Sequence, residues 1–366
     1  MKLTIEKKVL LEKLNLVQGI AERRATMPIL SHILINCTEN KINITATDLE
    51  TTLSTWADAN VEQESKIAIP ARKLFEIIKE LPEGSIRLEE IKNNWVELKT
   101  NSGTYKIAGL PGEDFPILPE VHTEDFFTID SNLLDELISK TIYCVSPDDL
   151  RRNLSGIYFE KTDNGNLRLV ATDGHRLSLA EKKLDEDITL INNVLVPRKA
   201  VTELRKILKQ LKTVSIGCEK NFFITKGEDI VLYSRLIDAD FPDYKQVVPE
   251  NSEIEIILNR DIFLSALKRV CVFSSEKTKS VKLNLENNSI TLTSVSPDVG
   301  EAKETFGTSY QGEAKEVGFN GNYIIDVLET MNETEISFKL TDELSPTVLK
   351  PTDNNNYISV VMPMRI

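Results

Sequence analysis

The residues best suited to acid or base chemistry lie at a recurring Thr-Asp pair. Thr47-Asp48 and Thr172-Asp173 each follow an apolar, strand-like run, and His175 comes two residues after Asp173. Two carboxylates in equivalent positions could form a paired acid/base site, and a carboxylate could also activate the imidazole. An enzyme with an acid/base site at the Asp173-His175 turn is therefore one hypothesis.

A structural turn explains the same residues more simply. An Asp side chain that follows a strand commonly accepts hydrogen bonds from the backbone N–H groups of the next residues. No nucleophile stands at a recognisable spacing from His175, and the chain contains no GxxxxGK[ST], no GxGxxG after a strand and no GxSxG. We therefore predict no catalytic residue and no cofactor.

Residue types that ligate metals are few and scattered. The histidines and cysteines are His32, His122, His175, Cys37, Cys144, Cys218 and Cys271. No pair has the spacing of a metal site, and a chain of 366 residues needs no disulfide to hold its core. We predict no metal site and four reduced thiols.

Behind the Thr-Asp pairs stands a threefold internal repeat. Segments that read as a strand and then an apolar helix begin near Ile5, Ile129 and Leu258, about 125 residues apart. Copies of a related segment lie midway, at residues 67–74, 194–201 and 317–324. The repeat predicts three domains, at residues 1–124, 125–251 and 252–366.

Between the predicted helices the apolar residues alternate with polar ones. This period of two is typical of half-buried strands, and Asn and Gly clusters between the runs predict hairpin turns. The clearest runs are residues 41–45, 166–170, 289–293 and 335–340. Each domain therefore reads as two halves of strand, helix and about three strands, an α+β fold with helices on one side and sheets on the other.

The net charge of the chain restricts how the protein could bind DNA. A net charge of −13 argues against general DNA coating, unless the positive charge gathers on one surface. Residues 198–212 predict a helix whose apolar residues form one stripe. Its cations lie on another face and are Arg198, Lys199, Arg205, Lys206, Lys209 and Lys212. Glu203 is the one acidic residue in this segment.

Other predicted helices carry cations more sparsely, and the sixth carries none. For a single helix a solvated charged face is the simpler interpretation, but four of six equivalent helices favour a shared basic surface. Such a surface would contact phosphates without reading sequence, because helix-turn-helix and zinc-finger patterns are absent. No apolar run of about 18 residues exists, and the charged start of the chain is unlike a signal peptide, so we expect a cytoplasmic protein.

Taken together, the whole chain resembles the bacterial DNA polymerase III beta subunit family of sliding clamps. The most specific segments are residues 171–177, 196–199, 241–244 and 360–366. The resemblance implies a non-catalytic, head-to-tail homodimer that closes a ring around duplex DNA, with helices inside and sheets outside, and confers processivity. It implies as partners the replicative polymerase subunit, the clamp loader, and other polymerases and repair proteins that carry a short clamp-binding peptide.

The resemblance also assigns residues to three interfaces. The DNA contacts, including two arginines of a loop that carries aromatic residues in some clamps, are Arg24, Arg72, Lys73, Arg151, Arg152, Arg198, Lys199, Arg205 and Lys209. The peptide pocket comprises Leu154, Thr172, Gly174, His175, Arg176, Leu177, Pro242, Val247, Leu344, Val360, Met362, Met364 and Arg365. The dimer contacts are Lys73, Tyr105, Val272 and Phe273.

Besides the enzyme, a second alternative is an acidic repeat scaffold that binds only proteins. It predicts basic helix faces that point in unrelated directions and no passage of DNA through a ring. The enzyme predicts a concave cluster of perturbed titratable groups, whereas a clamp predicts an apolar groove.

Overall fold

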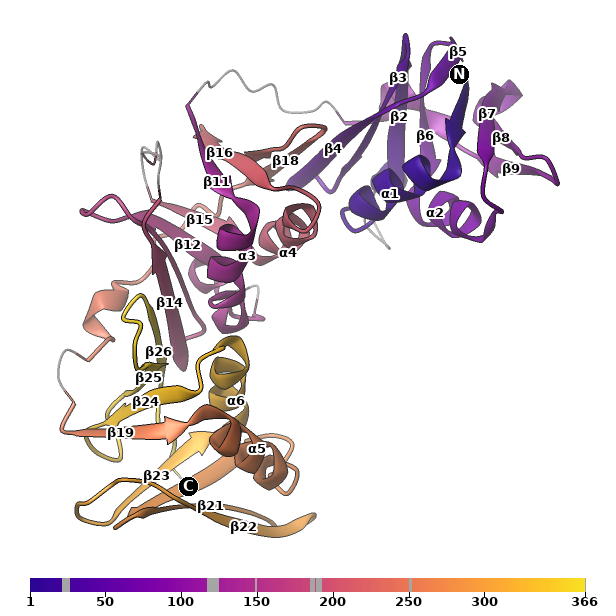
Figure 1. Ribbon diagram of the computed structural model, residues 1–366. Helices are drawn as coiled ribbons and strands as arrows, with labels where there is room; N and C mark the ends of the chain where they lie inside the picture. Colours follow the sequence, from indigo (N-terminus) through magenta and orange to yellow (C-terminus); the bar gives the residue numbers. More distant parts are fainter. Residues whose placement is uncertain are drawn as a thin grey trace. The chain divides into compact units, whose positions relative to one another are not determined.

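The computed structural model describes residues 1–21, 27–116, 125–148, 150–184, 188, 193–249 and 252–365. The chain divides into two compact units: residues 1–134 with 199–236, and residues 135–188 with 192–198 and 237–366 (Figure 1). The predicted domain boundaries near 124 and 251 lie outside the described residues.

The first unit contains helices α1 (Lys7–Val17), α2 (Ala71–Glu80) and nearly all of α4 (Arg198–Leu208). One antiparallel sheet has the order β5-β1-β7-β8-β9, and the other has the order β10-β6-β2-β3-β4-β18-β17-β16-β11. The strands are β1 (Lys2–Glu6), β2 (His32–Thr38), β3 (Lys41–Thr47), β4 (Thr51–Asp58), β5 (Asn60–Gln63), β6 (Ser65–Pro70), β7 (Ser85–Ile91), β8 (Trp95–Lys99), β9 (Thr104–Ala108), β10 (Leu110–Pro111), β11 (Phe126–Asp130), β16 (Thr213–Glu219), β17 (Phe222–Lys226) and β18 (Ile230–Arg235).

The second unit contains most of α3 (Ser131–Ser139), together with α5 (Arg260–Cys271) and α6 (Gly321–Thr330). Its sheets have the orders β15-β12-β13-β14-β26-β25-β24-β19 and β22-β21-β20-β23. The strands are β12 (Gly156–Lys161), β13 (Leu167–Thr172), β14 (Arg176–Lys182), β15 (Val194–Pro197), β19 (Ile254–Asn259), β20 (Ser280–Glu286), β21 (Ser289–Ser296), β22 (Gly300–Gly307), β23 (Lys315–Asn320), β24 (Glu335–Leu340), β25 (Thr347–Pro351) and β26 (Tyr357–Val361).

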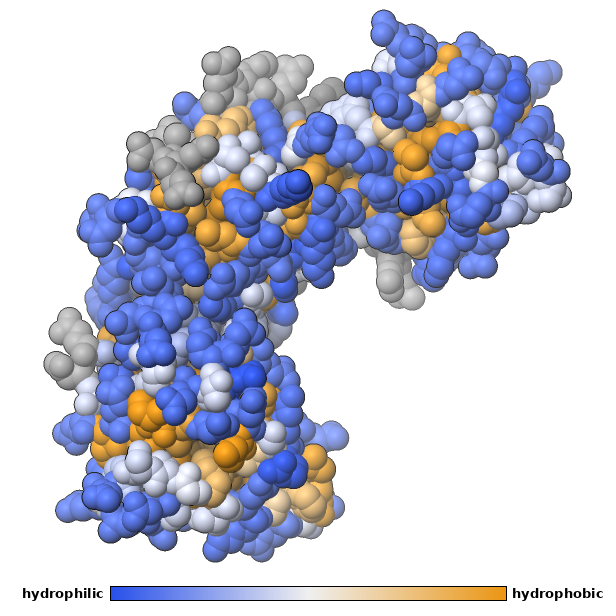
Figure 2. All heavy atoms as spheres, viewed as in Figure 1, coloured by the Kyte–Doolittle hydropathy of each residue, from blue (hydrophilic) through white to orange (hydrophobic). Residues whose placement is uncertain are grey.

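The periodicities of the sequence explain these elements. Strand β2 buries every second side chain, and α4 buries Val201, Leu204 and Leu208 while its cations stay at the surface. Each leucine or valine removed from water contributes about 2 kcal/mol, so these stripes hold the helices on the sheets. The visible surface in Figure 2 is mostly hydrophilic, with smaller apolar areas between.

Two long sheets are made by pairing strands from different repeats. In the first unit β4 pairs with β18, and Leu53 lies opposite Leu232. In the second unit β14 pairs with β26, and Leu177 lies opposite Val360. Both pairs are antiparallel, so the backbone hydrogen bonds of one repeat continue directly into the next.

Helix α4 ends at Leu208 and is therefore four residues shorter than the predicted helix at residues 198–212. The N–H of Gln210 bonds to the carbonyl of Ile207, which tightens the chain into a turn. The carbonyl of Lys212 then accepts a hydrogen bond from Ser131, just before β16 begins. Lys209 and Lys212 therefore lie beyond the helix.

No helix among the described residues combines the length and apolarity needed to cross a bilayer. The described part of the chain also contains no group of three or more His, Cys, Asp or Glu side chains placed to hold a metal ion.

Candidate nucleic-acid interface and apolar pocket

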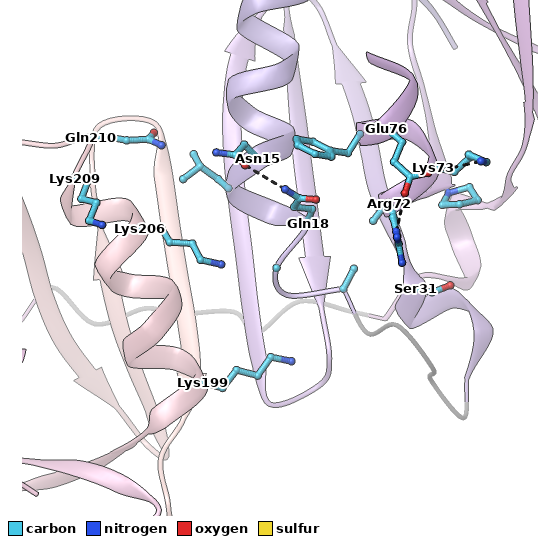
Figure 3. Close-up of a pocket in the computed structure, with 16 residues that line it drawn as sticks. Asn15, Gln18, Ser31, Arg72, Lys73, Glu76, Lys199, Lys206, Lys209 and Gln210 are labelled. Atoms are coloured by element: carbon cyan, nitrogen blue, oxygen red, sulfur yellow. Dashed lines mark hydrogen bonds and ion pairs between the residues drawn. The ribbon is translucent and has the colours of Figure 1, made fainter. Parts of the chain in front are cut away.

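A wide cleft in the first unit, of about 1420 Å³, is walled by cations from α2, α4 and the turn that follows α4. Asn15 of α1 and Gln18, the residue after this helix, form another part of its wall (Figure 3). The cations are Arg72, Lys73, Lys199, Lys206 and Lys209. Because both helices turn their apolar stripes into the core, their charged faces meet at one opening.

Acidic neighbours neutralise part of this charge. On α2, Glu76 accepts from Arg72 at 2.8 Å and lies 3.7 Å from Lys73 Nζ. On α4, Lys206 Nζ lies 2.6 Å from Glu203. These lysine and arginine side chains are about half exposed or more, and such surface pairs contribute about 0–1 kcal/mol, so they leave the cations available to a stronger anion.

Two lysines of the predicted DNA surface differ from one another. Lys199 Nζ contacts the carboxylate of Asp48, whose side chain is only 6% exposed, and also the carbonyl of Ile20. Lys209 is exposed and, among the described residues, has no carboxylate within ion-pair distance. Lys199 therefore has a structural partner, whereas Lys209 is the more available to phosphate.

The other predicted DNA contacts lie in different surroundings. Arg198 is exposed and Arg205 is partly buried on α4. Arg151 and Arg152 are exposed in the second unit, and Arg151 donates to the carbonyl of Asp173 at 3.3 Å. Arg24 lies outside the described residues.

The cations of α5, in the third repeat, are engaged with nearby acids or carbonyls. Lys268 of α5 pairs with Glu329 of α6 at 2.7 Å, and Arg269 pairs with Glu304 of β22. Arg260 donates to the carbonyl of Met331 at 2.9 Å, just after α6 ends. These cations of α5 are therefore less available to phosphate than Lys209, which has no carboxylate within ion-pair distance among the described residues.

The two Thr-Asp pairs form turns, as predicted. Asp48 Oδ1 accepts the N–H groups of Glu50 and Thr51, at 3.0 and 2.6 Å. Asp173 Oδ1 accepts the N–H groups of His175 and Arg176, at 2.9 and 3.0 Å. Each carboxylate is thus used to hold its hairpin.

An apolar cavity of about 270 Å³ lies in the second unit, beside the β14–β26 pairing. It is lined by Asn153, Leu154, Thr172, Gly174, Arg176, Leu177, Pro242, Tyr244, Val247, Val360 and Met362. Leu177, Tyr244 and Val360 also belong to a buried apolar cluster beneath it. The cavity therefore has a packed floor and could receive large apolar side chains.

Most of the predicted pocket residues border this cavity, and a few do not. His175 contributes its carbonyl, which accepts from the N–H of Met362 at 2.9 Å. The N–H of Met364 donates to the carbonyl of Gly318. Leu344 is 64% exposed and Arg365 is also exposed, and neither residue lines the cavity.

Sequence reasoning missed two lining residues, Asn153 and Tyr244. Tyr244 follows the Phe241-Pro242-Asp243 segment, so its place in that motif was the available signal. Its hydroxyl donates to Glu160 and accepts from Arg168 at 2.8 Å. Burial and the bond to Glu160 raise the pKa of Tyr244, which stays neutral and fixed in the cavity wall.

The predicted dimer residues are exposed. Val272 and Phe273, directly after α5, are 70% and 36% exposed. Tyr105 is 39% exposed on β9, at the edge of its sheet, and Lys73 is exposed on α2. Phe273 lies near Gly300, the first residue of the edge strand β22.

Comparisons with known proteins identify similar chains over the full length. Three family models match: the N-terminal, central and C-terminal domains of the DNA polymerase III beta subunit, at residues 1–119, 128–243 and 245–365. The beta sliding clamp of Proteus mirabilis is 36% identical and that of Caulobacter vibrioides 35%, with 100% of each chain covered in both cases.

Solved structures give the same result. A beta subunit from Caulobacter crescentus has a TM-score of 0.94 at 34% identity. A sliding clamp from Bartonella birtlesii, bound to griselimycin, has a TM-score of 0.96 at 31% identity. Each covers 100% of both chains, so the similarity includes all three repeats.

Proposed function

The chain belongs to the bacterial DNA polymerase III beta subunit family, and on this premise we propose how its surfaces serve a clamp. It is a sliding clamp, a non-catalytic processivity subunit built from three clamp domains, and its family works with DNA and a DNA polymerase. The protein-only scaffold and the enzyme are not favoured. We keep 1–124, 125–251 and 252–366 as the proposed domain limits.

We propose that a third strand pairing, between two copies of the chain, closes the ring. Strand β4 of the first repeat pairs with β18 of the second, and β14 of the second pairs with β26 of the third. By position in the repeat, the remaining partners are β22 and β9, and both are edge strands. Unpaired edges readily accept another strand, and β22 of one copy would meet β9 of the next head to tail.

The exposed side chains near these two edges support that pairing. Tyr105 lies on β9, while Val272 and Phe273 lie beside the start of β22. Exposed apolar residues next to an open strand edge are costly in water and are covered when two copies meet. Lys73, on the helix of the β9 half-domain, would lie at the same contact. We propose a closed homodimer.

The basic cleft carries the DNA-binding part of the proposal. A chain with a net charge of −13 places five cations, from α2, α4 and the turn after α4, around one opening. Duplex DNA would be held there through phosphates, weakly and without regard to sequence. Weak contacts suffice in a linked ring, because retention depends on closure, and the acidic remainder discourages non-specific binding.

The apolar cavity is the proposed docking site for partner proteins. Leucine, valine, proline and methionine side chains line it and leave room for apolar residues of a short peptide. The flexible thioether of Met362 would let different peptides fit in turn. The replicative polymerase subunit, the clamp loader, and other polymerases and repair proteins are the proposed partners.

Retention on DNA of different topology tests the ring. The chain is loaded onto nicked circular DNA, and half of the sample is then linearised with a restriction enzyme. We expect the protein to stay on the circle and to leave the linear form, with a solution mass of two chains. Equal retention on both forms, or a monomeric mass, would contradict the closed ring.

A further inference from the structure

Arg176 borders the apolar cavity, but the groups that bind its guanidinium do not line this cavity. Its guanidinium donates to Asp326 Oδ2 at 2.5 Å, to Asp173 Oδ2 at 3.0 Å and to the carbonyl of Tyr143 at 2.6 Å. The guanidinium carbon also lies 4.4 Å from the ring centroid of Tyr323. None of these four partners is among the described residues that line the cavity.

These contacts explain how a cavity with an arginine in its wall stays apolar. The Arg176 side chain is 11% exposed, so its guanidinium has few hydrogen bonds to water. A buried guanidinium is costly unless carboxylates and hydrogen bonds satisfy it. The charged end is held by Asp173, Asp326 and Tyr143, which leaves the methylene stem to contribute to the apolar wall.

The two carboxylates differ in what holds them. Asp173 lies in the same hairpin turn as Arg176, and its other oxygen accepts the backbone N–H groups of that turn. Asp326 comes from α6, 150 residues along the chain, where Ile324, Val327 and Leu328 are buried. One of the two carboxylates that hold the guanidinium therefore comes from a helix of the third repeat.

We propose that Asp326 is a positioning residue for peptide binding, which holds the Arg176 charge outside the cavity and so makes the cavity prefer apolar over acidic side chains. The inference rests on the proposed docking function of the cavity. Without the Asp326 carboxylate, the guanidinium loses its partner from α6 and turns toward the cavity, where a bound acidic side chain satisfies it.

Two fluorescently labelled peptides test this specificity. They are identical except at one position, so that one presents Leu-Phe and the other presents Leu-Glu. Their affinities are measured for the full-length chain and for Asp326→Asn. We expect the ratio of Leu-Phe to Leu-Glu affinity to fall about tenfold, the effect of one charge-assisted hydrogen bond.

Glu329→Gln is the matched control. Glu329 lies on the same helix and also forms an ion pair, with Lys268 of α5. That pair lies outside the cavity lining, so we expect both peptide affinities to change less than about twofold. Tyr323→Leu, which removes the ring beneath the guanidinium, should shift the ratio in the same direction by about threefold, and it tests the proposal independently if Asp326→Asn does not fold.

A double-mutant cycle separates positioning from general support of the fold. When Arg176→Met is already present there is no charge to direct, so adding Asp326→Asn should leave the ratio unchanged. A parallel loss of affinity for both peptides, or an unchanged ratio in folded Asp326→Asn, would overturn the inference. If the unaltered chain bound neither peptide, the docking role of the cavity would fail instead.

Discussion

Lys199 and Asp48 lie 151 residues apart in the chain, and the lysine Nζ contacts the aspartate carboxylate. The same carboxylate closes the β3–β4 hairpin turn, and β4 pairs with β18. The contact therefore ties the start of α4 to the turn beside the joint between two repeats. A cation that the sequence pattern places on the DNA surface takes part in holding the fold.

This contact predicts that substitutions of two lysines at the same cleft have different effects, one on stability and the other on DNA binding. Lys199→Ala leaves the nearly buried Asp48 carboxylate without its cation and should lower the free energy of unfolding by about 1 kcal/mol. Lys209→Ala should leave stability within about 0.5 kcal/mol but reduce the slope of log binding against log salt by about 1. Urea unfolding and DNA retention at several salt concentrations measure both. Identical behaviour of the two variants would be inconsistent with the structure.

The proposed ring predicts that a negative charge introduced directly after α5 strongly weakens the dimer. Val272→Asp places a carboxylate where two copies would exclude water, and a two-chain ring contains this contact twice. We expect the dissociation constant of the dimer to rise at least about thirtyfold, which corresponds to about 2 kcal/mol. Sedimentation at falling protein concentration measures it.

Ile262→Asp is the control for that experiment. Ile262 is 53% exposed on the same helix, but in its first turn, away from Phe273 and the start of β22. Its substitution should leave the dimer mass unchanged. Dissociation by Ile262→Asp but not by Val272→Asp would place the contact elsewhere.

The cavity lining predicts which exposed apolar residues matter for peptide binding. Val247 lines the cavity at 41% exposure, whereas Leu344 is 64% exposed and does not line it. Val247→Ala should weaken a Leu-Phe peptide about fivefold, since it removes about 1 kcal/mol of apolar contact. Leu344→Ala should change the affinity less than about twofold. Fluorescence polarisation measures the peptide affinity of both variants. A larger loss of affinity for Leu344→Ala than for Val247→Ala would show that Leu344 belongs to the peptide site.

The cysteines should react slowly in the folded chain. Burial raises the pKa of Cys37 and of Cys218 to about 12, and that of Cys271 to about 11. Because only the thiolate is nucleophilic, a pKa of about 11 to 12 lowers the reactive fraction at pH 8 to about one part in a thousand or less. Mass spectrometry after iodoacetamide treatment should find the native chain largely unlabelled and the urea-unfolded chain labelled at all four thiols.

Local spacing was sufficient to predict the repeated α+β architecture. The alternating runs at 41–45, 166–170, 289–293 and 335–340 lie within β3, β13, β21 and β24, apart from Asn166, which lies one residue before β13. The Asp48 and Asp173 turns also depend only on neighbouring residues, so their sequence pattern predicted them directly. The end of α4 was predicted too late, because the chain after Leu208 is held by a hydrogen bond from Ser131, the first residue of α3, to the carbonyl of Lys212.

The sequence by itself determined the strands and helices and the gathering of cations on one predicted helix, since each follows from residues a few positions apart. It also determined the three clamp repeats, since similar segments recur about every 125 residues. Only the tertiary structure decided which charges stay available. Lys199 meets Asp48 and Arg176 meets Asp326 across about 150 residues, through strand pairing and helix packing. Such contacts depend on how distant segments are placed in space, which no local periodicity encodes.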